Sequence, residues 1–214
     1  MTMMIIEPIG ARAKAPWIGP KRVLDVTLTV VVLVVCWPIF AAIAAAIAAS
    51  SPGPVFFVQT RVGRGGKTFR MIKFRSMYLD AESRRAEIEK LSDREGLCLK
   101  VKTDPRITPV GRFLRRCSLD ELPQLFNVLR GDMSLVGPRP ALVEEVAKYP
   151  DHAHGRHDVL PGITGLWQVS GRADIGFEEM IKLDLDYVQK VSFATDISIL
   201  FKTIRAVVSG RGAY

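Results

Sequence analysis

The sequence predicts an α-rich α+β fold anchored in a membrane from one side, and three observations carry this prediction. First, the 24 residues from Val26 to Ala49 contain no charged side chain. Second, basic residues flank this stretch at both ends, in a chain of net charge +8. Third, two β-prone segments surround a glycine-rich turn, and helix-prone segments fill most of the rest. We therefore expect a monotopic membrane protein with a small β-hairpin and amphipathic interfacial helices.

The apolar stretch predicts a membrane helix that turns back. As a straight helix it would be about 36 Å long, enough to cross the ~30 Å hydrocarbon core. Pro38 lies near its middle, where proline removes a backbone hydrogen bond and kinks the helix. Lys21 and Arg22 precede the stretch, and residues 51–79 contain six basic residues and no acidic one. Basic flanks favour the cytoplasmic side, so the pattern favours a re-entrant helical hairpin over a spanning helix or a cleaved signal peptide.

The chain divides into three predicted parts. Residues 1–20 form an N-terminal tail, residues 21–50 the re-entrant membrane helix, and residues 51–214 a domain at the cytoplasmic face. The three cysteines, Cys36, Cys98 and Cys117, form no CxxC pair. An odd number of isolated cysteines does not indicate a disulfide framework and fits a reducing cytoplasm.

Glycine and proline mark the elements that follow. The Ser-Pro-Gly-Pro run at residues 51–54 ends the membrane helix. Residues 55–62 and 67–74 flank the turn at residues 63–66 and predict a β-hairpin. A phosphate loop is excluded there, because Arg61 stands where the first glycine of that motif is required. Residues 161–172 predict an ordered loop with a short strand. We expect helices over residues 76–97, 109–116, 118–128, 141–149, 178–190 and 197–208.

Two of these segments have alternative interpretations. Residues 197–208 are amphipathic, so this helix packs on the core or lies in the membrane interface. His152, His154 and His157 form a cluster in a loop-like stretch. Metal ligation is one interpretation of this cluster, but the spacing does not match the usual helical or finger ligand sets. We expect solvated loop histidines.

An acidic pair beside arginines is the candidate reactive site. Ser118 followed by Glu121 fits a capping box, a structural role that needs no chemistry. The same helix start would favour phosphate, and an ionised carboxylate there can act as a nucleophile. Phosphoryl transfer needs mainly positioning and charge stabilisation, often with Mg²⁺. Besides Asp120 and Glu121, the candidate phosphate-binding residues are Lys73, Arg75, Arg112, Arg115 and Arg139.

Several long motifs in one order resemble the bacterial sugar transferase family of monotopic phosphoglycosyl transferases. The resemblance covers nearly the whole chain after Pro20. One departure is Trp37 before Pro38, where some members carry serine. The matching stretches are KRVLD (21–25), SPGPVFFVQTRVG (51–63), FRMIKFRSM (69–77), SLDELPQLFNVLRGDMSLVGPRP (118–140), PGITGLWQVSGR (161–172) and LDLDYV (183–188).

The resemblance implies a two-step reaction. Asp120 would attack the β-phosphate of a UDP-sugar, releasing UMP and leaving a covalent sugar-phosphoryl aspartate. Undecaprenyl phosphate would then take the sugar phosphate. Glu121 would assist by holding Mg²⁺, and Arg139 would contact phosphate or nucleotide. Lys73, Arg75 and Arg172 are weaker phosphate-binding candidates, and Asp184 would position a substrate or form a pair on a helix surface.

The resemblance also implies a place and a substrate class. The site would lie at the cytoplasmic face of the bacterial inner membrane, in contact with membrane lipid, and would start exopolysaccharide or O-antigen synthesis. LWQVSGR and the C-terminal RGAY favour galactose or glucose, with an N-acetylhexosamine as the alternative. A non-catalytic membrane-anchored basic module is the rival class. We expect no nucleic-acid partner, because no helix-turn-helix or aromatic-basic RNA motif is present, and the sequence leaves homo-oligomerisation open.

Overall fold

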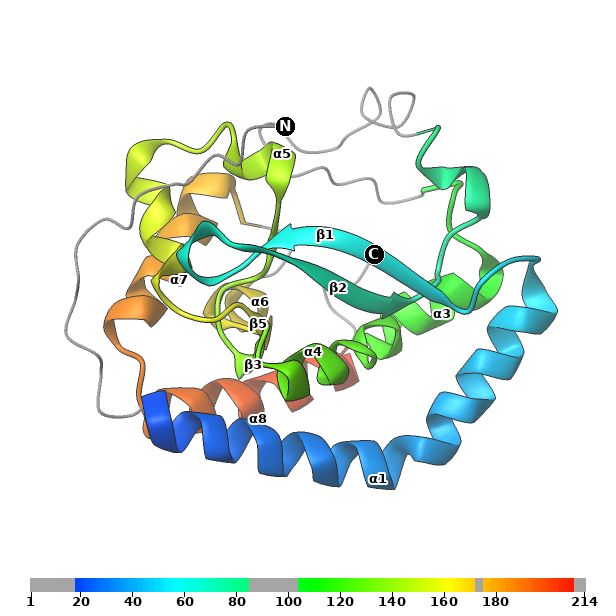
Figure 1. Cartoon of the computed structure of the whole chain (residues 1–214), viewed down its shortest axis with the longest axis horizontal. Helices are drawn as coiled ribbons and strands as arrows, with labels where there is room; N and C mark the ends of the chain where they lie inside the picture. The colour runs from blue at the N-terminus through cyan, green and yellow to red at the C-terminus, as the bar shows by residue number, and fades with distance from the viewer. Residues whose placement is uncertain (1–17, 85–103, 172–174, 210–214) are drawn as a thin grey trace.

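The computed structural model describes residues 18–84, 104–171 and 175–209. A long helix, α1 (Ile18–Ser50), runs along one side of the molecule, and the other elements lie on its inner face (Figure 1). These elements are β1 (Phe56–Val62), β2 (Thr68–Phe74), α3 (Pro109–Arg116), α4 (Gln124–Arg130), β3 (Ser134–Val136), β4 (Ala141–Leu142), α5 (Val143–Val146), β5 (Gly162–Thr164), α6 (Leu166–Ser170), α7 (Phe177–Gln189) and α8 (Phe193–Ser209). Single 3₁₀ turns or helices are η1 (Arg64–Gly66), η2 (Leu79–Ala81), η3 (Leu119–Glu121) and η4 (Asp151–Asp158). The predicted α-rich fold with small sheets is confirmed.

Helix α1 is continuous across Pro38 and bent (Figure 1). Proline has no N–H for the carbonyl of Val34, one turn earlier, and its ring crowds that carbonyl. The predicted kink is therefore present. The structure has one bent helix rather than two antiparallel limbs, so the re-entrant hairpin itself stays a prediction.

The two faces of α1 have different surroundings. Phe40, Ile43 and Ile47 are buried against Phe74 and Leu114 of the body. On the outer face, apolar side chains such as those of Val34, Val35 and Trp37 are 64–71% exposed. The 32 residues Gly19–Ser50 are long and apolar enough to cross a membrane by length and composition. Exposed apolar surface of this extent marks an interaction site, and on a helix of this length it fits a membrane anchor.

Polar side chains attach the N-terminal end of α1 to the body. Lys21 Nζ lies 2.7 Å from Asp196 Oδ2, and Arg22 donates to the carbonyls of Val128 and Leu129 at the end of α4. One turn later, the buried Asp25 accepts a hydrogen bond from Ser134 Oγ at 2.7 Å. This end of α1 is therefore held by contacts to residues more than 100 positions away in the sequence.

Besides the apolar packing of Phe40, Ile43 and Ile47, the side chain of Arg75 attaches the C-terminal end of α1 to the same body. The buried guanidinium of Arg75, just after β2, donates to the carbonyls of Ser51 and Pro52, both at 2.7 Å, and to Ser51 Oγ at 3.0 Å. Both ends of the apolar helix thus bind a single folded unit.

The predicted β-hairpin is confirmed. Strands β1 and β2 pair antiparallel, with Phe57 opposite Lys73, and they turn through η1, where Gly65 has a φ of +65°. Strand β4 extends this sheet along β1, whereas β3 and β5 form a separate parallel pair. Because opposite residues of antiparallel strands share a face, Arg61, Met71 and Lys73 emerge on the same side of the hairpin.

Helices were predicted well where no backbone constraint interrupts them. The bounds of α3 match the prediction, and α7 and α8 match within a few residues. The expected helix over residues 118–128 is wrong in part, because Ser118 adopts a left-handed φ of +56° and Pro123 separates η3 from α4. The expected helix over 141–149 is also shorter, since Ala141 and Leu142 pair with β1. Most of the expected helix over 76–97 lies outside the described residues, and its first part contains η2.

Candidate active site

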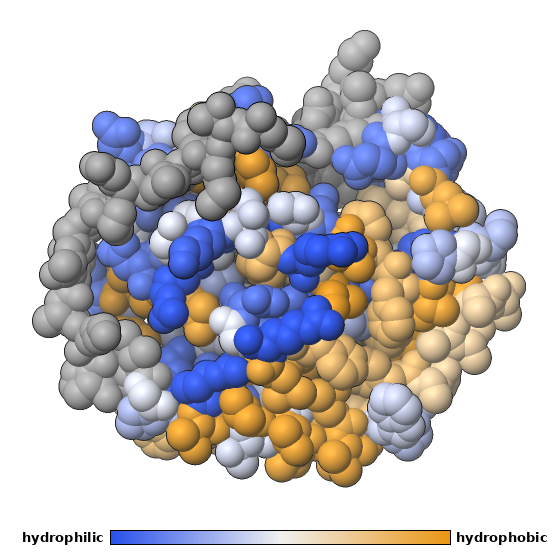
Figure 2. All heavy atoms as spheres, viewed as in Figure 1, coloured by the Kyte–Doolittle hydropathy of each residue, from blue (hydrophilic) through white to orange (hydrophobic). Residues whose placement is uncertain are grey.

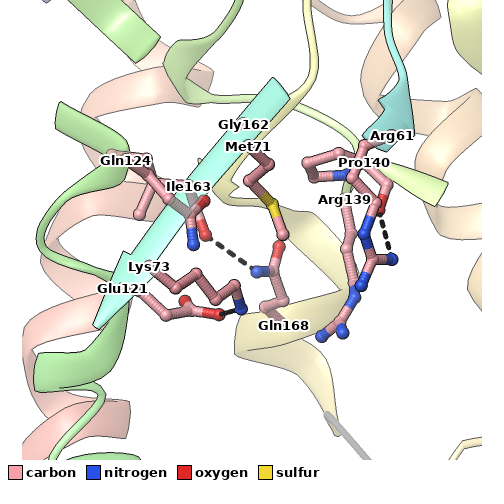
Figure 3. Close-up of a pocket in the computed structure, with 10 residues that line it drawn as sticks. All are labelled: Arg61, Met71, Lys73, Glu121, Gln124, Arg139, Pro140, Gly162, Ile163 and Gln168. Carbon is pink, nitrogen blue, oxygen red and sulfur yellow. Dashed lines mark hydrogen bonds and ion pairs between the residues drawn. The ribbon is translucent and has the colours of Figure 1, made fainter. Parts of the chain in front are cut away.

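A shallow pocket on the face of the hairpin collects charged and polar side chains from distant parts of the sequence (Figure 3). Its empty space is about 220 Å³, including the open mouth. Lys73 and Glu121 lie at one end, Arg139 and Arg61 at the other, and Gln168 lies between them (Figure 3). The lining residues are Arg61, Met71, Lys73, Glu121, Gln124, Arg139, Pro140, Gly162, Ile163 and Gln168. Three predicted site residues, Lys73, Glu121 and Arg139, are therefore brought together.

The closest charged contact in the pocket joins Lys73 and Glu121. Lys73 Nζ lies 2.7 Å from Glu121 Oε1, and their side chains are 17% and 25% exposed. The pair connects β2 to η3. Because both groups keep access to solvent, a bound phosphate can reach the ammonium and a cation can reach the carboxylate.

Asp120 lies beside this pair and is 7% exposed. It does not line the pocket itself. Burial raises the pKa of the Asp120 carboxyl, and the neighbouring Glu121 adds to the rise, whereas Lys73 and Arg115 oppose it. The sequence placed this carboxylate at a helix start, which would favour its ionised form, whereas its burial in the structure acts in the opposite direction. Two cations near a desolvated carboxylate are nevertheless a suitable setting for a nucleophile.

The capping box predicted for Ser118 and Glu121 is absent. Ser118 has left-handed backbone dihedrals, and its side chain makes no cap hydrogen bond. The acidic pair occupies the single turn η3 instead of the first turn of a helix. A capping role for Glu121 is therefore excluded. Its carboxylate forms the ion pair with Lys73 instead.

Close backbone packing fixes the position of the turn that carries Arg139, which is the GPRP segment at residues 137–140. The ladder of β3 and β5 brings Gly137 against Gly162 and Gly165. A Cβ on Gly162 would lie 2.1 Å from the nitrogen of Gly137, and one on Gly165 would lie 2.3 Å from the Gly137 oxygen. These glycines explain why the GPRP and PGITG segments pack against each other. Arg139 itself is exposed at the pocket rim.

The remaining predicted site residues lie elsewhere. The Arg75 guanidinium is occupied by carbonyls at the end of α1, so its contacts favour an anchoring role. Arg112 is exposed on α3, outside the pocket lining. Arg115 donates to Ser76 Oγ at 2.9 Å and acts on Asp120 electrostatically. Arg172 lies outside the described residues.

Asp184 is buried rather than at the surface of a helix. It is 1% exposed and paired with the equally buried Arg156. The alternative of a pair on a helix surface is therefore wrong, and the role in positioning a substrate stays a prediction that would have to be indirect. Burial raises the pKa of Asp184, and Arg156 opposes the rise.

Sequence reasoning missed several pocket residues. Gln124 and Gln168 stand inside the motifs quoted above, as does Arg61, which entered the argument only to exclude a phosphate loop. Arg156 lies outside every quoted motif. The position of Gln124, Gln168 and Arg61 within motifs was a signal that could have identified them. Arg156 had no such signal, and only the fold shows its contacts.

The expectation of solvated loop histidines holds for His152, which is exposed, but not for His157. His152, His154 and His157 lie in η4, and His157 is buried. Burial lowers the pKa of His157 to about 3, with a further contribution from Arg156, so its ring is neutral near pH 7. In the part of the chain that the structure describes, no three His, Cys, Asp or Glu side chains gather as a metal site.

These features define a class: a domain with a charged surface pocket, carried on a long apolar helix. The chain belongs to the bacterial sugar transferase family, whose model matches residues 17–210. The predicted family resemblance is thus confirmed.

Named relatives share this region. The galactosyl transferase CpsE of Streptococcus agalactiae serotype III is 45% identical over 90% of this chain and 43% of its own length. The UDP-glucose:undecaprenyl-phosphate glucose-1-phosphate transferase of Xanthomonas campestris pv. campestris is 43% identical over 91% of this chain and 40% of its own length. The exopolysaccharide production protein ExoY of Sinorhizobium fredii is 38% identical, over 98% of this chain and 91% of its own. The chain therefore spans less than half of the first two relatives and most of the third.

Proposed function

We propose that this chain transfers a hexose-1-phosphate, from UDP-galactose or UDP-glucose, to undecaprenyl phosphate at the cytoplasmic face of the inner membrane. The observation that carries the proposal is the pocket in which Lys73, Glu121 and Arg139 meet beside Asp120. Its charges suit a diphosphate.

The reaction proceeds in two displacements at phosphorus. An Asp120 carboxylate oxygen forms a bond to the β-phosphorus, and the bond from that phosphorus to the bridging oxygen breaks. UMP leaves with the electron pair. A phosphate oxygen of undecaprenyl phosphate then forms a bond to the same phosphorus, the aspartyl–phosphorus bond breaks, and the free carboxylate returns. Lys73 and Arg139 face the phosphate oxygens from opposite ends of the pocket and stabilise the charge that builds up on them.

The acidic pair also fits the ligand preference of magnesium. Mg²⁺ is commonly held by one or two carboxylates together with substrate phosphates rather than by a full protein cage. Glu121 would hold the ion, since Asp120 is the nucleophile. When bound, Mg²⁺ would supply charge neutralisation on the diphosphate. Without a cation, the Lys73 ammonium partners Glu121.

A re-entrant arrangement of α1 is part of the proposal. A helix that crosses the bilayer separates its ends by the full membrane, whereas both ends of α1 hydrogen-bond to the same body. With its two ends on one side, the apolar middle of α1 can enter the lipid and return. The exposed apolar side chains of its outer face supply the lipid-contacting surface.

We expect the two ends of α1 to be accessible from the cytoplasm only. Gly19→Cys and Lys67→Cys, placed singly in a cysteine-free parent, alter exposed positions in the first turn of α1 and beyond its C-terminal end. A membrane-impermeant maleimide should label neither variant in intact spheroplasts and both after lysis. Labelling of Gly19→Cys alone in intact spheroplasts would show that the helix spans the membrane.

A donor panel tests the activity and the sugar together. The purified full chain in nanodiscs is given UDP-galactose, UDP-glucose and the two UDP-N-acetylhexosamines, each with and without undecaprenyl phosphate. We expect UMP release with galactose or glucose, turnover only with the lipid acceptor, and loss of turnover after Mg²⁺ chelation. Release from acetamido donors alone would overturn the sugar assignment. No release from any donor would leave the non-catalytic module as the better description.

A further inference from the structure

We propose that the buried ion pair of Arg156 and Asp184 positions Arg139 for the reaction by holding the backbone of the turn that carries it. This inference rests on the proposed function, because it assigns to Arg139 the phosphate contact described above. Neither member of the pair lines the pocket, so both would act as positioning residues.

Three consecutive carbonyl oxygens of the turn accept hydrogen bonds from three different elements. The Pro138 oxygen accepts from the Gly162 nitrogen of β5 at 2.8 Å. The Arg139 oxygen accepts from Arg156 Nη2 of η4 at 3.0 Å, and the Pro140 oxygen accepts from Arg61 Nη1 of β1 at 3.2 Å. Because prolines flank Arg139 and lack an N–H, carbonyls are the main backbone groups by which this turn can be held.

The Arg156–Asp184 ion pair fixes the positions of its neighbours more than it adds to the free energy of unfolding. Arg156 and Asp184 are 2% and 1% exposed. Burying two charges carries a desolvation cost that their attraction often only balances, and apolar replacements are frequently neutral or stabilising. Arg156 also donates to the Tyr149 hydroxyl at 2.7 Å. Its Nη1 is thereby held by Tyr149, and its Nη2 donates both to Asp184 Oδ2 and to the Arg139 carbonyl.

Arg139 is a residue that needs such support. Its side chain is exposed and has no hydrogen-bond or ion-pair partner among residues 18–84, 104–171 and 175–209. Figure 3 shows it at the opposite end of the pocket from Lys73 and Glu121. Since no hydrogen bond or ion pair directs the Arg139 guanidinium, the position of this group over the pocket depends on where the backbone of the turn is held.

The test combines a structural and a kinetic measurement on the full chain in nanodiscs. Asp184→Asn removes the charge partner, and Arg156→Lys keeps the ion pair but loses the guanidinium fork. The matched control is Asp196→Asn, because Asp196 is also 1% exposed and ion-paired, but to Lys21 at the start of α1. Hydrogen exchange is followed over residues 137–142, and kcat/KM for UMP release is measured in the parent and in an Arg139→Ala background.

We expect faster exchange over residues 137–142 in Asp184→Asn and Arg156→Lys, but not in Asp196→Asn. Both variants should lose on the order of 10²-fold in kcat/KM, the effect of a misplaced positioning group. In the Arg139→Ala background the further loss should stay within about twofold, because the pair acts through Arg139.

Two results would overturn the inference. One is unchanged exchange in both variants, and the other is an equal loss of kcat/KM with and without Arg139, which indicates a general structural role. If the parent releases no UMP from any donor, the proposed function fails, and the exchange measurement still decides whether the pair holds the turn.

Discussion

Asp120→Asn is expected to abolish turnover while leaving a more stable fold at neutral pH. Removing a nucleophile costs on the order of 10⁶-fold in kcat. Burial raises the pKa of Asp120 above its usual 3.8, so folding favours the protonated form over the carboxylate. The neutral form stabilises the fold fully below the unfolded pKa, and that stabilisation is lost as pH rises through the folded pKa. Asparagine keeps the side chain neutral at every pH.

Three measurements check this result. UMP release gives the activity, thermal unfolding at several pH values gives the stability, and mass spectrometry of parent incubated with donor alone seeks a phosphosugar on the Asp120 peptide. The stability gain of Asp120→Asn should shrink as pH falls. Asp151→Asn, which alters an exposed aspartate in η4, should leave both activity and stability unchanged. Turnover by Asp120→Asn at the parental rate would rule out the aspartyl intermediate.

Lys73→Met is expected to lower kcat/KM at neutral pH and to move the acid limb of its pH profile upward. Lys73 pairs with Glu121 at 2.7 Å and opposes the rise in the pKa of Asp120. Without the ammonium, the pKa of Asp120 rises further, so a higher pH is needed to ionise the nucleophile. Loss of one charge-stabilising group at the phosphate adds a decrease on the order of 10²–10³-fold.

The pH profile distinguishes this explanation from simple loss of binding. Lys73→Arg keeps the charge and should keep the acid limb near that of the parent. Lys67→Met removes an exposed lysine from the same hairpin, outside the pocket. This variant should change neither kcat/KM nor the acid limb of the pH profile. An acid limb that does not move in Lys73→Met would contradict the proposed coupling between Lys73 and Asp120.

Local patterns predicted the elements that depend on local forces. The hairpin follows from its glycine turn, α3 from the helix-prone stretch that begins at Pro109, and the kink of α1 from Pro38. The break at Ser118 was not predictable, because serine has no preference for a left-handed φ and tertiary contacts must impose it. Figure 2, coloured by hydropathy, shows hydrophobic side chains gathered along the lower edge of this face, where Figure 1 places α1, with hydrophilic side chains mostly above them.

The sequence predicted those site residues that stand in recognisable motifs and bear charged side chains. Lys73, Glu121 and Arg139 stand in three motifs, and the fold joins them in one pocket. Arg75 and Asp184 stand in motifs as well, yet their contacts are with the scaffold. A sequence motif does not separate a residue that touches substrate from one that holds the backbone. Arg156 carried no signal because two of its partners, Arg139 and Asp184, are 17 and 28 residues away and meet it only in the folded chain.

The attachments at the two ends of α1 have a consequence for how the protein responds to its lipid surroundings. A single helix that crosses a bilayer adapts to a thicker or thinner membrane by tilting. Lys21 and Asp25 hold one end of α1 to the body, and Arg75 holds the other, so tilting of α1 would have to carry the whole body with it. In the proposed re-entrant arrangement, the protein's own geometry would set the height of the pocket above the lipid headgroups. A soluble donor and a lipid acceptor would meet at a fixed depth, whatever the thickness of the bilayer.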